Sequence, residues 1–203
     1  MGKIFVFIGP SCSGKDTIFK NITNDNNLKP IVLYTTRPKR DKEINGITYN
    51  FITDQELKEM DNNNEIIEKR EYNTIYGIWT YATCSKSIDL DNNNYAIINT
   101  LEGYKKLKEY YGSDTVIPLY ISVSKKIRLE RAINREMKQK EPKYEELCRR
   151  FLADCKDFSN EKLIEAGITK TYNNDNSIDI VIDEINQTIN NELEKTKQKK
   201  KII

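Results

Sequence analysis

The chain has 203 residues, of which 37% are hydrophobic and 32% are charged, a composition typical of a globular domain with one sizeable core. Lysine and arginine number 33 and aspartate and glutamate 31, so the formal net charge is only +2. This balance argues against a nucleic-acid-binding protein, which would carry a strong basic excess. The chain has no histidine, which excludes Ser-His and Cys-His hydrolases and His-ligated metal enzymes. Phosphoryl transfer needs only lysine, arginine, backbone amides, oxygen ligands and a hard cation, so it remains available.

The four cysteines, at positions 12, 84, 148 and 155, show neither paired spacing nor a zinc-binding pattern. The sequence has no signal peptide and no apolar stretch near 18 residues in length. We therefore expect a cytoplasmic protein that binds neither membranes nor nucleic acid.

Strand-like and helix-like segments alternate along much of the chain. Residues 3–8, KIFVFI, form a continuous apolar run typical of a strand buried on both faces, and a helical pattern begins near Lys15. An amphipathic helical segment ends at Gly112. Further strand-like runs follow at 31–34, 95–100 and 116–123. This alternation predicts an α/β fold with a parallel sheet and right-handed crossovers.

Two segments interrupt this alternation. Residues 34–90 are rich in Thr, Arg, Asn and Tyr and predict an inserted β-rich lobe. Residues 125–157 are strongly charged and helical, with Pro142 between two helices. A last amphipathic helix is expected over 178–195, followed by a basic tail, 196–203, that we expect to be frayed.

The segment GPSCSGKDT, Gly9 to Thr17, fits the first part of the phosphate-loop pattern G-x-x-x-x-G-K-[ST]. Its glycines allow successive N–H groups to point inward, and the following helix adds its positive end. Lys15 supplies a charge for the outer phosphates. Asp16 stands where such loops usually carry a hydroxyl. It is either an acidic residue stabilised by the helix dipole or an oxygen ligand for Mg²⁺, and neither explanation implies an inactive loop.

A second basic segment, YTTRPKRDKEINGITYNF, spans residues 34–51. Arg37 and Arg40 lie three residues apart, and Tyr49 follows a turn expected at Asn45–Gly46. Two forked guanidiniums and a phenol suit a tetrahedral phosphate dianion, which arginine binds in a bidentate manner. Taken alone, the segment would be interpreted as a solvated basic loop.

Together these motifs resemble those of the guanylate kinase family. The family carries G-P-S-x-x-G-K, then T-T-R-x-x-R, then N-G-x-x-Y-x-F, and this chain has GPSCSGK, TTRPKR and INGITYNF in the same order. Downstream, NNEIIEKREYNTIYG is similar to the family's N-x-E-F-I-E segment and its Tyr-Gly, and RAINRE and CRRFLAD are similar to the arginine-bearing lid. The segment YNND is similar to the short turn near the adenine. The resemblance covers residues 3–185.

The resemblance implies a single P-loop NTPase domain with a three-layer core, an acceptor-binding lobe and a helical lid. The core would comprise 1–33, 91–124 and 158–195, the lobe 34–90 and the lid 125–157. The ATP-binding positions would be Gly9, Pro10, Ser11, Cys12, Ser13, Gly14, Lys15, Asp16 and Thr17, with Asn173 and Asn174 near the adenine. The acceptor-binding positions would be Arg37, Arg40, Tyr49, Glu68, Tyr76, Gly77 and Thr100. The catalytic positions would be Lys15, Arg37, Arg131, Arg135 and Arg150.

The resemblance further implies what each group contacts. Glu68 would accept hydrogen bonds from the edge of a guanine, and the arginines of the lid would neutralise the transferring phosphoryl group. The expected reaction moves the γ-phosphoryl group of ATP, with Mg²⁺ held by Asp16, to GMP or dGMP. Nucleotides are the expected partners, and a monomer or a homodimer is expected.

The chain departs from the family pattern at four polar positions, where Leu33, Ile78, Ile98 and Thr100 replace a hydroxyl residue or a carboxylate. Two alternatives to a GMP acceptor therefore stay open. Ribose 1,5-bisphosphate phosphokinases are similar to this family and carry Gly-Lys-Asp in the loop, which favours a phosphorylated sugar. The other alternative is a catalytically inactive guanylate-kinase-like binding module.

Overall fold

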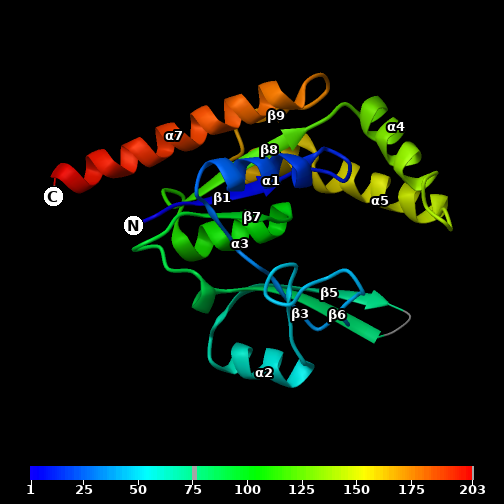
Figure 1. The fold of residues 1–203 in the computed structure, drawn as a ribbon, viewed down its shortest axis with the longest axis horizontal. Coiled ribbons are helices and arrows are strands. Elements are labelled where there is room, and N and C mark those ends of the chain that lie inside the picture. The colour runs from blue at the N-terminus through cyan, green and yellow to red at the C-terminus, as the bar shows by residue number, and fades with distance from the viewer. Residues whose placement is uncertain (75–76, 203) are drawn as a thin grey trace.

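The computed structural model describes residues 1–74 and 77–202, and Tyr76 of the expected acceptor site lies outside these residues (Figure 1). Seven α-helices and nine strands are defined within them. The strands are β1 (Ile4–Ile8), β2 (Lys29–Pro30), β3 (Tyr34–Thr35), β4 (Asn50–Phe51), β5 (Ile66–Thr74), β6 (Gly77–Cys84), β7 (Tyr95–Ile98), β8 (Val116–Ser122) and β9 (Thr171–Asn173). The helices are α1 (Lys15–Asp25), α2 (Asp54–Asn62), α3 (Leu101–Tyr111), α4 (Lys125–Glu136), α5 (Tyr144–Asp157), α6 (Asn160–Glu165) and α7 (Ile178–Ile202).

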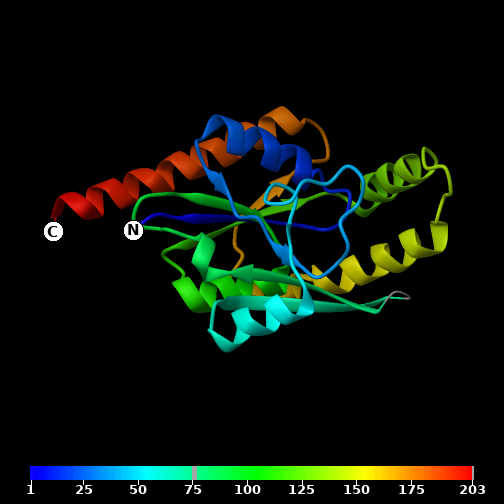
Figure 2. The same cartoon turned by 60° about the horizontal axis from the view of Figure 1, so that its bottom comes forward.

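The main sheet is parallel and has the strand order β2-β7-β1-β8-β9. All five residues of the central strand β1 are buried, because helices cover both faces of the sheet. Ile4, Val6 and Ile8 pack on the side of α3, whereas Phe5 and Phe7 pack on the side of α1 and α7. Figure 2 shows this sheet between α1 and α7 on one side and α3 on the other. The expected α/β fold with a parallel sheet and a three-layer core is confirmed.

A second sheet, of order β4-β3-β6-β5, lies apart from the main sheet within the segment expected to form the β-rich lobe (Figure 1). Its longest pair, β5 and β6, is antiparallel. Helix α2 begins with a capping box in which Thr53 and Glu56 satisfy each other's backbone N–H groups. The pair α4 and α5 projects from the end of the main sheet at which β8 leads into α4, with Pro142 in the connection between the two helices (Figure 1).

Two local expectations are wrong. The run 31–34 is not one strand, because the chain leaves the main sheet within it: the N–H of Ile31 still donates to Ala96 of β7, whereas the carbonyl of Leu33 already accepts from Asn50 of the second sheet. The last helix does not end at residue 195, since α7 continues to Ile202. It contains no Gly or Pro, and a Glu192–Lys195 ion pair supports it.

The expected end of the 101–112 helix is confirmed, because Gly112 caps α3 with a φ of 85°. Within residues 1–74 and 77–202, none of the helices is long and apolar enough to span a membrane.

Candidate active site

The phosphate loop connects β1 to α1 at the carboxyl end of the main sheet. Gly9 has a φ of 154°, and a Cβ atom there would lie 2.3 Å from the carbonyl oxygen of Ile121 on β8. The loop can therefore lie against the sheet only with glycine at this position. Helix α1 begins at Lys15, so the loop amides and the positive end of the helix face the same space.

Lys15 lines a cavity of about 860 Å³. We call it the larger cavity, in contrast to a second cavity of about 430 Å³. The Nζ of Lys15 donates a hydrogen bond of 2.9 Å to the carbonyl of Pro10 within the loop. Burial lowers the pKa of Lys15, although the nearby carboxylates of Asp16 and Asp154 act in the opposite direction. A bound phosphate would favour the charged form of this lysine far more strongly than one carbonyl does.

Asp16 and Thr17 are exposed in the first turn of α1. Their carboxylate and hydroxyl oxygens are hard ligands of the type that Mg²⁺ prefers, so the donor set at this position fits the ion. Among residues 1–74 and 77–202, no cluster of three or more His, Cys, Asp or Glu side chains is arranged to hold a metal. Any magnesium bound here would take most of its oxygens from water and from nucleotide phosphates.

Asn174 supports the phosphate loop from behind. Its buried side-chain amide donates a hydrogen bond of 2.9 Å to the backbone carbonyl of Ser13. Its backbone carbonyl accepts a hydrogen bond of 2.9 Å from the Nη2 of Arg131 on α4. The structure thus joins two expected site residues, Asn174 and Arg131, to the loop backbone. Asn173 is exposed, and its side chain contacts Asp175 in the same turn.

Helix α5 contacts the phosphate loop through two charged side chains. Arg150 donates 3.2 Å from Nη2 to the hydroxyl of Ser11, and Asp154 accepts 2.8 Å from the N–H of the same residue. Arg128 of α4 lies 3.6 Å from the Asp154 carboxylate. The sequence analysis missed Asp154, although its place one helical turn after Arg150 puts both on the same helix face.

A smaller cavity of about 430 Å³ lies between the phosphate loop and the α4–α5 pair. Several positively charged side chains from distant segments line it, together with Ser11 and Cys12 of the loop. They are Arg40, Arg128, Arg135, Lys143 and Arg150. Arg40, Arg135 and Arg150 of the expected site are therefore brought together beside the loop.

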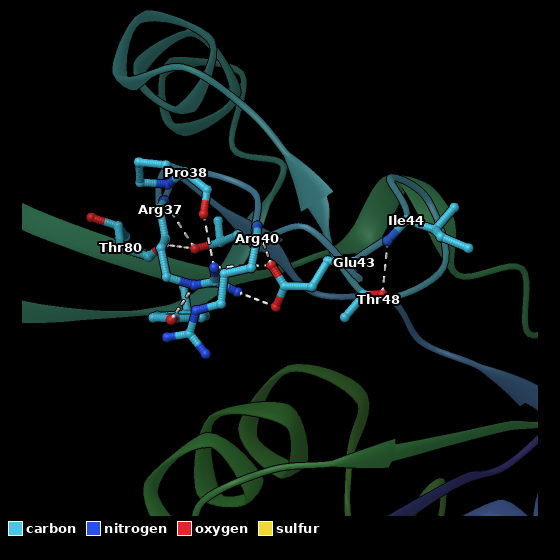
Figure 3. A network of polar contacts seen from close by, with 9 residues as sticks. Arg37, Pro38, Arg40, Glu43, Ile44, Thr48 and Thr80 are labelled. Carbon is cyan, nitrogen blue, oxygen red and sulfur yellow. Dashed lines mark hydrogen bonds and ion pairs between the residues drawn. The ribbon is translucent and has the colours of Figure 1, made fainter. Parts of the chain in front are cut away.

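Arg37 is placed differently from Arg40 (Figure 3). Its side chain is 3% exposed, and the carboxylate of Glu43 accepts two hydrogen bonds from it, of 3.0 Å and 2.7 Å. Its Nε donates 3.1 Å to the hydroxyl of Tyr81, and the guanidinium lies over the ring of Tyr49. This pairing lowers the pKa of Glu43 and raises that of Arg37. Arg37 is thus committed to internal contacts, whereas Arg40 is exposed.

Tyr49 lines the larger cavity, and burial raises its pKa. Its ring packs edge-on against Tyr81. Tyr72 and Trp79 also line this part of the cavity, so its walls are largely aromatic. Gly77, another expected acceptor residue, is exposed at the start of β6.

Glu68 is buried in a polar network. Its Oε1 accepts 2.7 Å from the hydroxyl of Thr83 and 3.2 Å from the amide of Asn99. Arg70, which the sequence analysis did not single out, is ion-paired with it, with 3.2 Å between Nε and Oε2. The Nη1 of Arg70 also donates 3.4 Å to the hydroxyl of Thr100, the N-cap residue of α3. Arg70 and Thr100 line the larger cavity, whereas Glu68 lies beneath them.

The model of the guanylate kinase family matches residues 1–199. The chain belongs to the guanylate kinase family. It is 30% identical over 137 residues to a guanylate kinase of Bartonella henselae, covering 66% of this chain and 60% of that protein. It is 41% identical over 100 residues to a guanylate kinase of Mycoplasmoides gallisepticum, covering 48% of this chain and 50% of that protein.

The chain thus spans about half of the length of the curated relatives it matches. Its fold is similar to that of a crystal structure of guanylate kinase from Anaplasma phagocytophilum, with a TM-score of 0.67 at 20% identity. That match covers 94% of this chain and 86% of the other. The relatives are named guanylate kinases, so the family to which the chain belongs is one of kinases.

Proposed function

We propose that this chain transfers the γ-phosphoryl group of ATP to a purine nucleoside monophosphate, with GMP or dGMP as the acceptor. The observation that carries this proposal is the larger cavity itself. Lys15 and Arg150 line it, and so do Tyr49 and, from β5 and β6, Tyr72 and Trp79. Such a cavity offers cations for phosphates and flat apolar walls for a base.

The transfer would depend on alignment and on charge neutralisation. The loop amides and Lys15 would hold the outer phosphates of ATP, and Arg135 and Arg150 would approach them from the lid. Arg40 and Tyr49 would hold the acceptor phosphate. Arg37, engaged by Glu43, would keep the rings of Tyr49 and Tyr81 in place and is a positioning residue in this proposal.

Magnesium, when bound with ATP, would neutralise phosphate charge, with Asp16 and Thr17 as its nearest protein oxygens. No strong general base is required, because the acceptor phosphate is already an anion. Closure of α4 and α5 over the loop would exclude water and so limit the hydrolysis of ATP.

Two other functions are separable from this one. A phosphorylated sugar as acceptor is supported by the burial of Glu68 under Arg70, which leaves less of its carboxylate for a base. A binding module without catalysis would have no use for a lysine that lines the cavity next to a curled loop of amides. The aromatic walls of the larger cavity favour the nucleotide over the sugar.

The test is the release of ADP by the purified chain over all common nucleoside monophosphates and ribose 1,5-bisphosphate, with Mg²⁺ and ATP present. Turnover that depends on GMP or dGMP is the expected result, and turnover only with the sugar would overturn it. Calorimetric titration with Mg·ATP is the matched control, because a chain that binds no ATP fits the binding module alone.

A further inference from the structure

The acceptor end of the larger cavity contains a guanidinium where the family resemblance led us to expect an open carboxylate. We propose that Arg70 is a specificity-determining residue that donates its forked N–H groups to two adjacent acceptors on the base, as O6 and N7 of guanine provide. This inference rests on the proposed function, because it names the residue that selects the acceptor in the same cavity.

The strand pairing places Arg70 at this position. Glu68 and Arg70 lie two residues apart on β5, so both side chains project from the same face of the second sheet. Their partners on β6 are Thr83 and Tyr81. Glu68, 3% exposed, therefore lies deep beside Thr83, and Arg70, 20% exposed, lies next to the cavity.

The oxygens of Glu68 are already used within the protein. Oε1 accepts from the hydroxyl of Thr83 at 2.7 Å, from the amide of Asn99 at 3.2 Å and from the Nη2 of Arg70 at 3.4 Å. Oε2 lies 3.2 Å from the Nε of Arg70. Oε1 therefore has no acceptor position left for the N–H groups of a base, whereas Oε2 receives no hydrogen bond from the residues that the structure describes and faces the guanidinium of Arg70. Of the two residues, Arg70 is the one that lines the cavity and is therefore accessible to a base.

Arg70 is held in place without being saturated. Glu68 fixes one side of the guanidinium, and Thr100, fixed in turn as the N-cap of α3, accepts from Nη1 on the other side. The two hydrogen bonds from its terminal nitrogens are both 3.4 Å long, beyond the usual length, so a better-placed acceptor can replace them. A guanidinium that is oriented before binding loses little freedom when a ligand arrives.

The charge and the walls of the pocket favour a base over a second phosphate at this point. The positive charge of Arg70 is compensated by Glu68, so the pair is neutral as a whole. Tyr72 and Trp79, paired next to Arg70 on β5 and β6, also line the cavity, and their rings suit a flat, uncharged heterocycle. Guanine presents acceptors at both O6 and N7, whereas adenine presents a donor at N6, which would oppose the donors of Arg70.

The test compares the binding of GMP, 7-deaza-GMP and AMP by calorimetry, with ADP release measured separately. In 7-deaza-GMP a C–H replaces N7, so one acceptor for Arg70 is lost while the rest of the base is kept. The affinity of the wild-type chain for GMP is expected to exceed its affinity for 7-deaza-GMP by about 10-fold or more. This is the size of effect that one arginine–guanine contact provides. Equal binding of the two by the wild type would overturn the proposal without any variant.

The variant Arg70→Gln is expected to move the GMP-to-AMP ratio toward AMP, because glutamine pairs with N6 and N7 of adenine. An unchanged ratio would overturn the proposal. The double variant E68Q/R70Q guards against misfolding, since it leaves no unpaired charge, and it is expected to lose the same discrimination. Lys69→Gln is the matched control on the same strand, because Lys69 pairs with Asp61 outside the cavity.

These measurements separate the inference from the proposed function. A chain that binds GMP through Arg70 but releases no ADP would overturn only the proposed function. A chain that phosphorylates GMP with unchanged discrimination after Arg70→Gln would overturn only the role of Arg70.

Discussion

The two ends of the larger cavity differ in how closely they follow the motifs that the sequence carries. At the phosphate loop, glycines set the backbone and Lys15 faces the cavity, as the pattern predicts. Near the acceptor end, the expected ligand groups Arg37 and Glu68 are buried behind the cavity lining and engaged by Glu43 and Arg70. A function carried by backbone amides follows from local sequence, whereas one carried by side chains depends on which partners the fold brings to them.

The largest expected effect is the loss of turnover when Lys15 of the phosphate loop is replaced. Lys15→Met should lower the rate of ADP release by about 10²–10³-fold or more, because it removes the cation aimed at the transferring phosphates. The fold should persist, since burial already opposes the charge of this lysine. Lys20→Met, on the exposed face of the same helix, is the control and should keep wild-type turnover. Undiminished turnover of Lys15→Met would refute the assignment of the loop.

The second largest expected effect distinguishes the role of Arg37 from that of Arg40. Arg37→Ala should lower the free energy of unfolding by about 2 kcal/mol or more, since a buried guanidinium with charged and neutral hydrogen-bond partners is lost. Arg40→Ala should leave stability within about 0.5 kcal/mol of the wild type and raise the KM for the acceptor instead. Urea unfolding and steady-state kinetics measure the two quantities. Equal stability of the two variants would contradict the different roles assigned to them.

The sequence predicts those parts of the fold and the site that depend on neighbours along the chain. The buried strand β1, the cap at Gly112 and the left-handed turn at Gly14 all follow from local pattern. The division of 31–34 between two sheets does not, because it depends on strands more than 15 residues away. The ion pair of Glu68 with Arg70 requires the strand register to be known, and the contact of Asp154 with the loop joins residues 143 positions apart.

The third effect concerns how the charge of Asp154 changes the affinity of the loop for ATP. The Asp154 carboxylate accepts a hydrogen bond from the N–H of Ser11, in a loop that is expected to bind phosphates. Asp154→Asn keeps an acceptor for this N–H but removes a charge that repels phosphate. The affinity for ATP should therefore rise about 5-fold, equivalent to about 1 kcal/mol. Calorimetry measures it, and Asp183→Asn, at an exposed position of α7 that lines neither cavity, is the control. Weaker binding of ATP by Asp154→Asn would show that the carboxylate assists the nucleotide.

The smallest effect concerns pH at the acceptor end. The pKa of Glu43 is lowered by its hydrogen bonds from Arg37 and from the N–H of Arg40. In the unfolded chain this carboxyl has its ordinary pKa, so between the two values the unfolded state binds more protons than the folded state. The contribution of Glu43 to stability is therefore complete above the ordinary glutamate pKa, near pH 4, and is lost as the pH falls through the lowered value.

Glu43→Gln should be less stable than the wild type at pH 6, and the difference should shrink as the pH falls toward 3. Urea unfolding across this range tests it, with Glu59→Gln on the exposed face of α2 as the control. A difference that stays constant with pH would mean that Glu43 acts through shape and not through its charge on Arg37.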